Sequence, residues 1–431
     1  VNHGVKVYLF DENKDRDIEA IKEKTGDSEL VQIELGELGE DALSSSQLMV
    51  ISPGIPVDAP FTDVVRNAGI PIWSEIELAY HYGKGKIAAI TGTNGKTTTT
   101  ALVGEIVKAH NAKTIVVGNI GIPYTELCDT TDDDSDTVAE ISSFQLETVI
   151  DFHPNVSAIL NLTPDHLNRH YTFENYGNVK FSITKNQTMD DVTVLNYDDE
   201  HTRAMGEKAK DHCHVVYFSR LEKPAGGVYV EDGDIILEDG DKKINVLAIK
   251  DLKLMGAHNV ENVLAAVGIS YYMGVPVDVI RDVATSFKAV AHRIEYVDTI
   301  DGVAYYNDSK GTNPDAAIKG IQAMVAPTFL IGGGYDKGSE YDEWIEAFDG
   351  KVKWLVLIGQ TAQKIADCAK RHGFNSIIFE ENLQDAVAYC HENAVDGDAV
   401  LLSPACASWG QFDNYEQRGD MFKEYVRSYK E

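Results

Sequence analysis

Residues 88–98 read AAITGTNGKTT, and this stretch decides the fold of the 431-residue chain. The apolar run 87–91 predicts a buried strand, the glycines that follow predict a tight turn, and a helix is expected to begin at Lys96. In such a turn the backbone N–H groups and the positive end of the helix face a polyphosphate. Lys96 would reach the β- and γ-phosphates, and the hydroxyl of Thr97 would bind Mg²⁺.

The spacing departs from the general phosphate-loop pattern GxxxxGK[ST], because Ile90 stands where that pattern has its first glycine. The alternative interpretation is an ordinary glycine-rich turn between a strand and a helix. Glycine, lysine and threonine nevertheless stand at the right offsets after a strand, so we interpret the stretch as a nucleotide site. Its predicted ATP contacts are Gly92, Thr93, Asn94, Gly95, Lys96, Thr97 and Thr98.

Short apolar runs separated by helical spacing surround this loop. Such alternation is typical of α/β domains with mainly parallel sheets. The length favours two or three domains, and we predict boundaries near residues 75 and 288, which gives segments 1–75, 76–288 and 289–431. Strands are expected at 5–10, 47–51, 87–91, 114–117, 138–141, 156–160, 327–331, 353–358, 376–379 and 399–403.

Composition and charge argue against nucleic-acid-binding, membrane-spanning and cysteine-stabilised proteins. The formal net charge of -31 makes nucleic acid a poor partner, because an acidic surface repels phosphate backbones. No apolar run approaches the roughly 20 residues of a membrane span, and no signal peptide opens the sequence, so we expect a cytoplasmic protein without a membrane partner. The five cysteines are scattered and show no CxxC spacing, which argues against a disulfide framework and cysteine-based zinc sites.

Two polar clusters follow later strands. Glu140 ends the run 138–140, and a carboxylate at that edge of a sheet is a natural Mg²⁺ ligand, although alone it is equally well a solvated glutamate. His166 follows the run 156–160, and a lone histidine is more often structural. The acidic run 132–134 is interpreted as a solvated loop.

Together these segments resemble the Mur ligase family of cell-wall peptide ligases. The motifs cover nearly the whole chain in the expected order. Two of them, EISSFQLE and SPACASWGQFDNYEQRG, are similar to the D-glutamate-adding members, and the Asp-Asn-Pro-Arg motif of the diaminopimelate- or lysine-adding members does not occur. The matching segments are GTNGKTT (92–98), GNIG (118–121), EISSFQLE (140–147), TPDHLNRH (163–170), HNVEN (258–262), HRIE (292–295), NDSKGTN (307–313), GGGYDKG (332–338) and LLSPACASWGQFDNYEQRG (401–419).

The resemblance implies three α/β domains: a Rossmann-like N-terminal domain for a UDP-sugar, a central phosphate-loop domain for ATP, and a Rossmann-like C-terminal domain for an amino acid. It also implies an ATP-dependent amide ligase of peptidoglycan precursor synthesis. Such an enzyme adds D-glutamate to UDP-N-acetylmuramoyl-L-alanine through an acyl phosphate and releases ADP and phosphate. Two Mg²⁺ ions are expected, and nothing in the chain demands more than a monomer.

The resemblance assigns the metal ligands. Thr97 would hold the first Mg²⁺, while Glu140 and His166 would hold the second together with Lys180, which matches a lysine that becomes carbamylated. A free lysine, with a pKa near 10.4, would be a cation that repels the metal, whereas a carbamate offers an anionic oxygen. The alternative for Lys180 is an exposed lysine on a helix.

The resemblance also assigns further nucleotide contacts. Asn259 and Asn262 stand three residues apart, so on a helix both amides face the same side, and they look like adenine contacts. The alternative is that they mark the start of a helix. Arg293, Asp308 and Lys310 would reach the phosphates and ribose from the third domain, with surface ion pairs as the alternative.

The remaining assignments concern the two substrates. The predicted D-glutamate contacts are Thr312, Lys337, Ser408, Trp409 and Tyr415, beside a tight glycine turn at 332–334. The predicted UDP-sugar contacts are Ser52, Pro53, Gly54, Asn119, Gln145 and His166.

Members of the family open with a strand and a glycine-rich turn ahead of the segment that matches Val5–Asp11. We therefore expect that opening piece to lie outside the given sequence, or the uridine site to be incomplete. Two rival functions stay open. A folylpolyglutamate synthase-like ligase would act on folate, and a regulatory ATP-binding protein would have no need of the cluster around Lys337 and 408–415.

Overall fold

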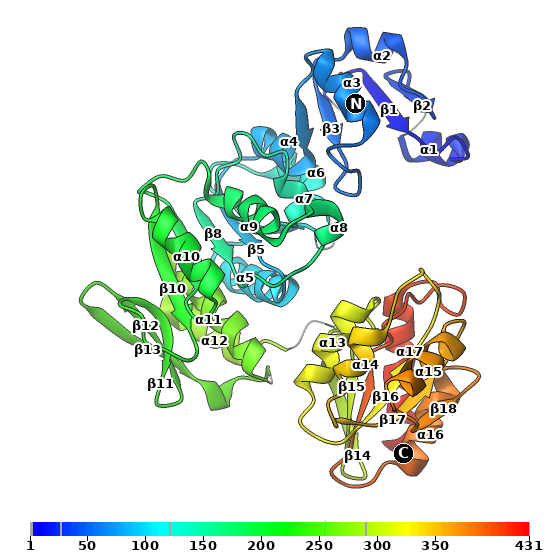
Figure 1. Ribbon diagram of the computed structural model, residues 1–431. Helices are drawn as coiled ribbons and strands as arrows, with labels where there is room; N and C mark the ends of the chain where they lie inside the picture. Colours follow the sequence, from blue (N-terminus) through cyan, green and yellow to red (C-terminus); the bar gives the residue numbers. More distant parts are fainter. Residues whose placement is uncertain (1–2, 26–27, 120–121, 255, 289–290, 431) are drawn as a thin grey trace. The chain divides into compact units, whose positions relative to one another are not determined.

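The computed structural model describes residues 3–25, 28–119, 122–254, 256–288 and 291–430 (Figure 1). The chain divides into two compact units, residues 1–252 with 257–286, and residues 253–256 with 287–431. Both units are mixed α/β with mainly parallel strand pairs, as predicted. Within the described ranges, no helix combines the length and apolar character needed to cross a membrane.

The N-terminal part of the first unit contains two small parallel sheets. β1 (Val7–Asp11) pairs with β2 (Val31–Leu35), and β3 (Met49–Ile51) pairs with β4 (Ile72–Ser74). Among the described residues, β1 and β3 each have this one neighbour, so the other edge of each strand is unpaired. The helices of this part are α1 (Ile18–Thr25), α2 (Glu40–Ser45), α3 (Pro60–Asn67) and α4 (Glu75–Tyr82).

The rest of the first unit is built on a nine-stranded sheet in the order β13-β12-β11-β10-β9-β8-β5-β7-β6. Its central strands are buried along almost their whole length, which explains their apolar sequences. The strands are β5 (Lys86–Thr91), β6 (Ile115–Gly118), β7 (Asp136–Glu140), β8 (Val156–Ile159), β9 (Val192–Asn196), β10 (His214–Ser219), β11 (Gly227–Glu231), β12 (Asp234–Asp239) and β13 (Lys242–Ala248).

Helices of this unit pack around that sheet, and α5 contacts both α11 and α12. The α-helices are α5 (Lys96–His110), α6 (Tyr124–Leu127), α7 (Ser143–Leu146), α8 (Leu167–His170), α9 (Phe173–Phe181), α10 (Glu200–Ala209), α11 (Ala257–Tyr272) and α12 (Val277–Ser286); the short 3₁₀ helices are η1 (Cys128–Thr130), η2 (Ser182–Thr184) and η3 (Ile249–Asp251).

The second unit holds a six-stranded sheet in the order β14-β15-β19-β16-β17-β18 with helices on both faces. Alternate residues of β16 point to opposite faces: Leu330 joins one core, and Phe329 and Ile331 join the other. The strands are β14 (Glu295–Ile300), β15 (Val303–Asn307), β16 (Thr328–Gly332), β17 (Val352–Leu357), β18 (Ile377–Phe379) and β19 (Ala399–Leu402); the helices are α13 (Pro314–Ala323), α14 (Asp342–Glu346), α15 (Ala362–Arg371), α16 (Leu383–Asn393), α17 (Tyr415–Arg427) and η4 (Ser428–Lys430).

Every predicted strand is present, with ends shifted by no more than a few residues. The sequence analysis missed the strands β2, β4, β9 and β10 and the antiparallel pairs β11–β12, β12–β13 and β14–β15. The hairpins β11–β12 and β14–β15 each turn on an Asp-Gly pair with positive φ at both residues: 52° and 86° at Asp232-Gly233, and 50° and 80° at Asp301-Gly302. This dipeptide is a strong hairpin signal that was available in the sequence. The boundary near residue 75 coincides with the start of α4, and the three-domain division stays a prediction.

Candidate active site

The predicted phosphate loop joins β5 to α5 in the first unit. Gly95 precedes the helix with φ 82°, and a Cβ atom there would lie 2.2 Å from Oδ1 of Asn262. Gly92 has φ 147°, and a Cβ atom there would press on the backbone of Leu160. Both positions therefore require glycine, for conformation and for space. The loop and the first helical turn form as the sequence predicted.

Lys96 folds back over this loop. Its Nζ donates to the carbonyl oxygens of Gly92 and Thr93, at 2.9 Å each. The side chains of Thr97 and Thr98 lie at the same helix end and are largely buried. A cation and unsatisfied helix N–H groups are thus concentrated where the loop would meet a phosphate.

Two further residues hold the loop, and the sequence analysis assigned no role to either. Asn161, just after β8, accepts a hydrogen bond from the backbone N–H of Asn94 at 2.8 Å and donates to the Asn94 carbonyl at 3.1 Å. The hydroxyl of Tyr176 shares a hydrogen bond of 3.1 Å with that of Thr93. A polar residue immediately after a strand adjacent to β5 was the available signal for Asn161.

Lys180 lies on α9 and is only 1% exposed, which excludes the alternative of an exposed helical lysine. Its Nζ donates to the carbonyl of Gly92 at 2.9 Å and lies 4.8 Å from the ring centre of Tyr176. Burial and, secondarily, the charge of Lys96 hold the pKa of Lys180 well below its usual value, against the smaller opposing influence of Asp165 and Glu140. Burial therefore disfavours the charged form of this amine.

Glu140 ends β7 and is 2% exposed. Its Oε1 accepts a hydrogen bond of 2.8 Å from the amide of Asn119. Its Oε2 is buried and, among the described residues, has no hydrogen-bond partner. Because a buried carboxylate oxygen without a partner is costly, this atom suits a divalent cation.

The structure does not bring His166 into direct contact with Glu140 or Lys180. Its side chain is 49% exposed, lies 3.5 Å from Asp165 and packs against Phe144, on a backbone with φ 52°. The buried histidine of this segment is His170, whose Nε2 lies 3.0 Å from the Ser143 hydroxyl. His166 stays a predicted ligand that would have to turn inward.

Gln145 and the adenine candidates also have defined positions. Gln145 closes a capping box with Ser142 and donates to Glu75 Oε1 at 2.6 Å, so its side chain supports the start of α7. The Asn262 amide donates to Asn259 Oδ1 at 3.1 Å, which confirms that the two amides share one face of α11. Thr99 of α5 donates to Asn262 Oδ1 at 3.3 Å, which ties that face to the phosphate-loop helix.

In the second unit, segments that follow β15, β16 and β19 meet at one sheet edge. The carboxyl ends of parallel strands are where α/β proteins bind ligands. Asp308, which follows β15, accepts a hydrogen bond of 2.7 Å from the hydroxyl of Ser403, which follows β19. Burial raises the pKa of Asp308 to about 7, against the smaller opposing effect of the Ser403 hydrogen bond and Arg293. The surface ion-pair alternative is wrong for Asp308, which is 3% exposed.

Arg418, which the sequence analysis quoted within a motif without a role, is the buried cation of this edge. It is 1% exposed, and burial lowers its pKa to about 10. Its guanidinium donates to the hydroxyl and carbonyl of Ser309, at 2.9 and 2.8 Å, and to the Cys406 carbonyl at 3.2 Å. Arg418 thereby joins the segments after β15 and β19.

The predicted amino-acid residues are divided between the two sides of this edge. Nζ of Lys337 lies 4.5 Å from the ring centre of Trp409, and Trp409 packs on Tyr335. The backbone N–H of Tyr335 donates to the Ala407 carbonyl, which pins the loop of Lys337 to the segment of Ser408. Nζ of Lys310 lies 5.8 Å from the ring of Tyr415. Thr312 follows on the same loop as Lys310, where its N–H donates to the Lys310 carbonyl.

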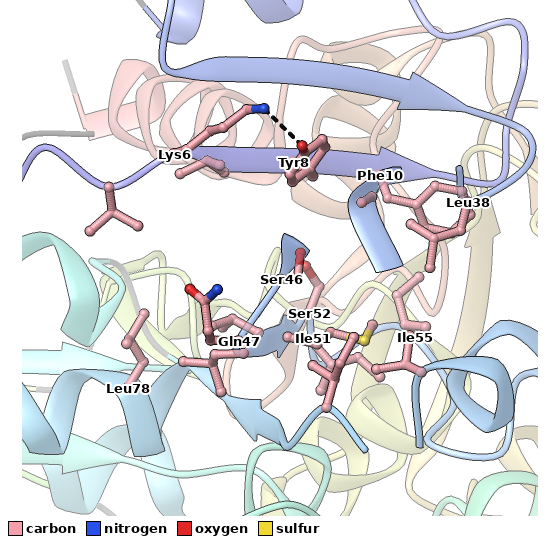
Figure 2. A pocket seen from close by; sticks show the side chains of 18 of the residues that line it. Lys6, Tyr8, Phe10, Leu38, Ser46, Gln47, Ile51, Ser52, Ile55 and Leu78 are labelled. Atoms are coloured by element: carbon pink, nitrogen blue, oxygen red, sulfur yellow. Dashed lines mark hydrogen bonds between the residues drawn. The ribbon is translucent and has the colours of Figure 1, made fainter. Parts of the chain in front are cut away.

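A cavity of about 1190 Å³ lies between β1 and β3 (Figure 2). Lys6, Tyr8 and Phe10 line one side, and Gln47, Ile51 and Ser52 line the other, so the predicted UDP-sugar segment lies at its wall. Among the residues that the structure describes, both sides are strand edges without a further strand partner. The expectation of an opening strand stays a prediction.

The two α/β units and the phosphate loop define a nucleotide-binding class of protein, and comparison with known proteins identifies its family. Family models match residues 90–270 as the Mur ligase middle domain and residues 292–406 as the Mur ligase glutamate ligase domain. The chain belongs to the Mur ligase family. A relative from Lachnospira eligens, named UDP-N-acetylmuramoylalanine–D-glutamate ligase, is 56% identical over 425 residues, which cover 99% of this chain and 94% of the relative.

Two solved structures show the fold at low sequence identity. The UDP-N-acetylmuramate-alanine ligase MurC from Thermotoga maritima matches with a TM-score of 0.59 at 20% identity, covering 99% of this chain and 94% of that one. MurF ligase from Thermotoga maritima, in complex with ADP, matches with a TM-score of 0.57 at 17% identity, covering 90% and 97%. The family resemblance predicted from the sequence is confirmed.

Proposed function

We propose that the chain is an ATP-dependent ligase that joins the carboxylate of UDP-N-acetylmuramoyl-L-alanine to the amine of D-glutamate, a step of peptidoglycan precursor synthesis. The shared name of relatives at 47–56% identity supports the donor and the acceptor. The ADP bound by MurF from Thermotoga maritima supports the nucleotide. In this proposal the activity lies in the cytoplasm, where ATP is available.

The observation that carries the proposal is the group around the phosphate loop. Lys96 and Lys180 both donate to the carbonyl of Gly92, and Glu140 lies close enough to Lys180 to influence its pKa. In the reaction, the donor carboxylate attacks the γ-phosphorus, the bond to ADP breaks, and an acyl phosphate forms. Lys96 would leave its carbonyl partners to neutralise the phosphate charge that develops in this step.

The residues present fit Mg²⁺, because the partnerless Oε2 of Glu140 is an oxygen ligand of the kind that this ion prefers. Thr97 would hold one ion, and Glu140, His166 and a carbamylated Lys180 would hold a second. Bound Mg²⁺ supplies charge neutralisation at the phosphate oxygens.

Carbamylation of Lys180 is supported by its position. A neutral amine attacks CO₂, forms the N–C bond and loses a proton, and the product is an anionic carbamate. Burial favours the neutral amine that this reaction needs. Without carbamylation, a protonated Lys180 would place a second positive charge beside Lys96 in this buried position.

The second unit would supply the acceptor. Lys337, beside Trp409, would bind a carboxylate of D-glutamate, and Ser408 lies on the segment pinned to the Lys337 loop. Tyr415 begins α17 beside Lys310 and would complete the pocket from that side. The amine of D-glutamate then attacks the acyl phosphate carbonyl, and phosphate leaves. For the donor, we propose that the turn Ser52-Pro53-Gly54 and Asn119 contact the UDP-sugar diphosphate.

The test is phosphate release from ATP and Mg²⁺ in the presence of UDP-N-acetylmuramoyl-L-alanine, with each candidate amino acid in turn. Release that depends on D-glutamate, with the coupled product detected by mass spectrometry, is the expected result. Release with a different amino acid would refute the acceptor assignment. Activity with a folate and glutamate instead would support the rival ligase.

A further inference from the structure

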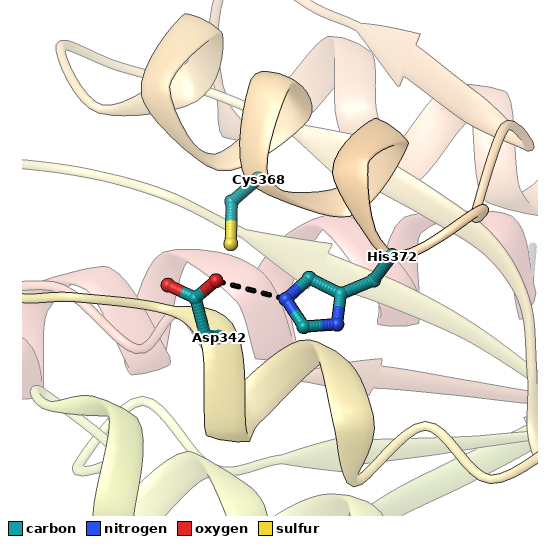
Figure 3. A group of neighbouring side chains, drawn as sticks. All are labelled: Asp342, Cys368 and His372. Carbon is teal, nitrogen blue, oxygen red and sulfur yellow. Dashed lines mark hydrogen bonds and ion pairs between the residues drawn. The ribbon is translucent and has the colours of Figure 1, made fainter.

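A cluster of three metal-ligating side chains lies in the second unit, apart from the sheet edge described above. Asp342 begins α14, Cys368 lies in the last turn of α15, and His372 caps α15 (Figure 3). One ligand atom from each residue lies within 4.8 Å of the other two. Nε2 of His372 and Oδ1 of Asp342 are 2.8 Å apart.

The spacing explains how two of these ligands converge. Cys368 and His372 stand four residues apart, so both project from the same face of α15. Asp342 approaches that face from the first turn of α14, and the cluster lies at the C-terminal end of α15, where the helix dipole favours a cation. The sequence analysis considered only Cys-Cys spacing, and this Cys-x₃-His pair was therefore passed over.

We propose that Asp342, Cys368 and His372 bind a zinc ion. A thiolate, an imidazole and a carboxylate are zinc ligands, whereas Mg²⁺ prefers oxygen ligands alone, so this site is distinct from the magnesium sites of the reaction. Zinc–ligand bonds of about 2.0–2.3 Å place tetrahedral ligand atoms roughly 3.3–3.8 Å apart, which small side-chain movements achieve here. The fourth position is open to water.

The second nitrogen of His372 also fits this assignment. Its Nδ1 lies 3.7 Å from Oε1 of Glu346, on the ring edge away from Asp342. A carboxylate behind a metal-ligating histidine fixes the ring orientation and raises its basicity. The zinc ion would tie α14 to α15 and so anchor the end of the segment that carries Lys337.

Arg371 competes with the ion. Its guanidinium lies 3.3 Å from Oδ1 of Asp342, and its side chain is 60% exposed, so zinc would displace it into solvent. Removal of this cation is expected to strengthen zinc binding several-fold, because a like charge beside the site costs binding energy.

The test uses full-length protein freed of metal with a chelator, then titrated with ZnCl₂ by calorimetry and with CoCl₂ by absorption, both with excess MgCl₂. We expect binding of a single ion and a thiolate-to-cobalt charge-transfer band. Cys368→Ser should abolish the band, His372→Ala should weaken zinc binding by more than about a hundredfold, and Arg371→Ala should strengthen it. His391→Ala, a histidine of the same unit outside the cluster, is the matched control.

Thermal unfolding in chelator checks that each variant folds, and Asp342→Asn replaces Cys368→Ser if the serine variant does not. Unchanged zinc affinity in His372→Ala and Asp342→Asn would overturn the proposal, as would a cobalt complex without the charge-transfer band. Loss of zinc binding with phosphate release intact would leave the proposed ligase function untouched, so the two proposals fail separately.

Discussion

The two units place ligand-binding candidates at the same kind of sheet edge but hold their charges differently. In the first unit, Lys96 and Lys180 lie against a carbonyl of the phosphate loop, and the pKa of Lys180 is depressed by burial. In the second unit, Arg418 is bound to backbone and hydroxyl oxygens of Ser309, while Lys337 lies over Trp409. The lysines of the first edge lie at the predicted phosphate loop, whereas the buried cation of the second edge joins two segments of the fold.

The largest effect is expected from Lys96→Ala. Loss of this charge should lower kcat for phosphate release by about a thousandfold or more, because a phosphate-loop lysine acts mainly on the transferring phosphoryl group. Steady-state phosphate release measures this effect. Lys108→Ala, an exposed lysine on the same helix, should leave kcat unchanged. If kcat fell equally in Lys96→Ala and Lys108→Ala, the proposed role of Lys96 at the phosphate loop would be wrong.

Lys180→Met should lower kcat by roughly a hundredfold, since it removes the proposed carbamate ligand. The wild-type rate should also fall in buffers stripped of CO₂ and recover when bicarbonate is added, while the variant should not respond. Rates measured in sealed, degassed buffers test this dependence. Two results together would contradict carbamylation: a wild-type rate that does not depend on CO₂, and a native mass spectrum of the protein that shows no added carboxylate group.

Arg418→Met tests the structural side of the comparison. It removes the guanidinium donors to the carbonyls of Ser309 and Cys406 and to the hydroxyl of Ser309, which keeps its bond to the Tyr415 carbonyl, and should cost about 2–4 kcal/mol of stability. Urea unfolding followed by tryptophan fluorescence reports mainly on the second unit, which holds Trp344, Trp354 and Trp409. A variant of unchanged midpoint with lost activity would instead make Arg418 a ligand-binding residue.

Asp308→Asn should show its effect in the pH dependence of stability, with little change at acidic pH. The folded pKa of about 7 lies above the unfolded value near 3.8, so the folded state binds the proton more tightly. Stability from this group is therefore full below about pH 4 and is lost as the pH rises through 7. The variant should be nearly as stable as wild type at pH 4 and more stable at pH 8, by up to about 4 kcal/mol. Parallel pH profiles would refute a buried, proton-binding Asp308.

Prediction from the sequence was strongest where local rules apply. The phosphate loop followed from glycines, a lysine and threonines at fixed offsets, and the parallel strands followed from short apolar runs. The same rules would have found the Asp-Gly hairpins and the Cys-x₃-His pair, since both are local patterns. Burial at the two sheet edges was harder to predict from the sequence. An exposed helical lysine stayed an alternative for Lys180, and a surface ion pair stayed an alternative for Asp308.

By itself, the sequence determined the family, the nucleotide loop and the positions of the predicted strands, because these depend on short-range spacing along the chain. Tertiary structure alone decided that Asn161 and Tyr176 brace the loop and that Arg418 joins two strand ends. It also decided that one buried oxygen of Glu140 has no hydrogen-bond partner within the described part of the chain. The physical reason is that burial and hydrogen bonding join segments far apart in sequence, and the desolvation that shifts a pKa exists only once those segments have packed together.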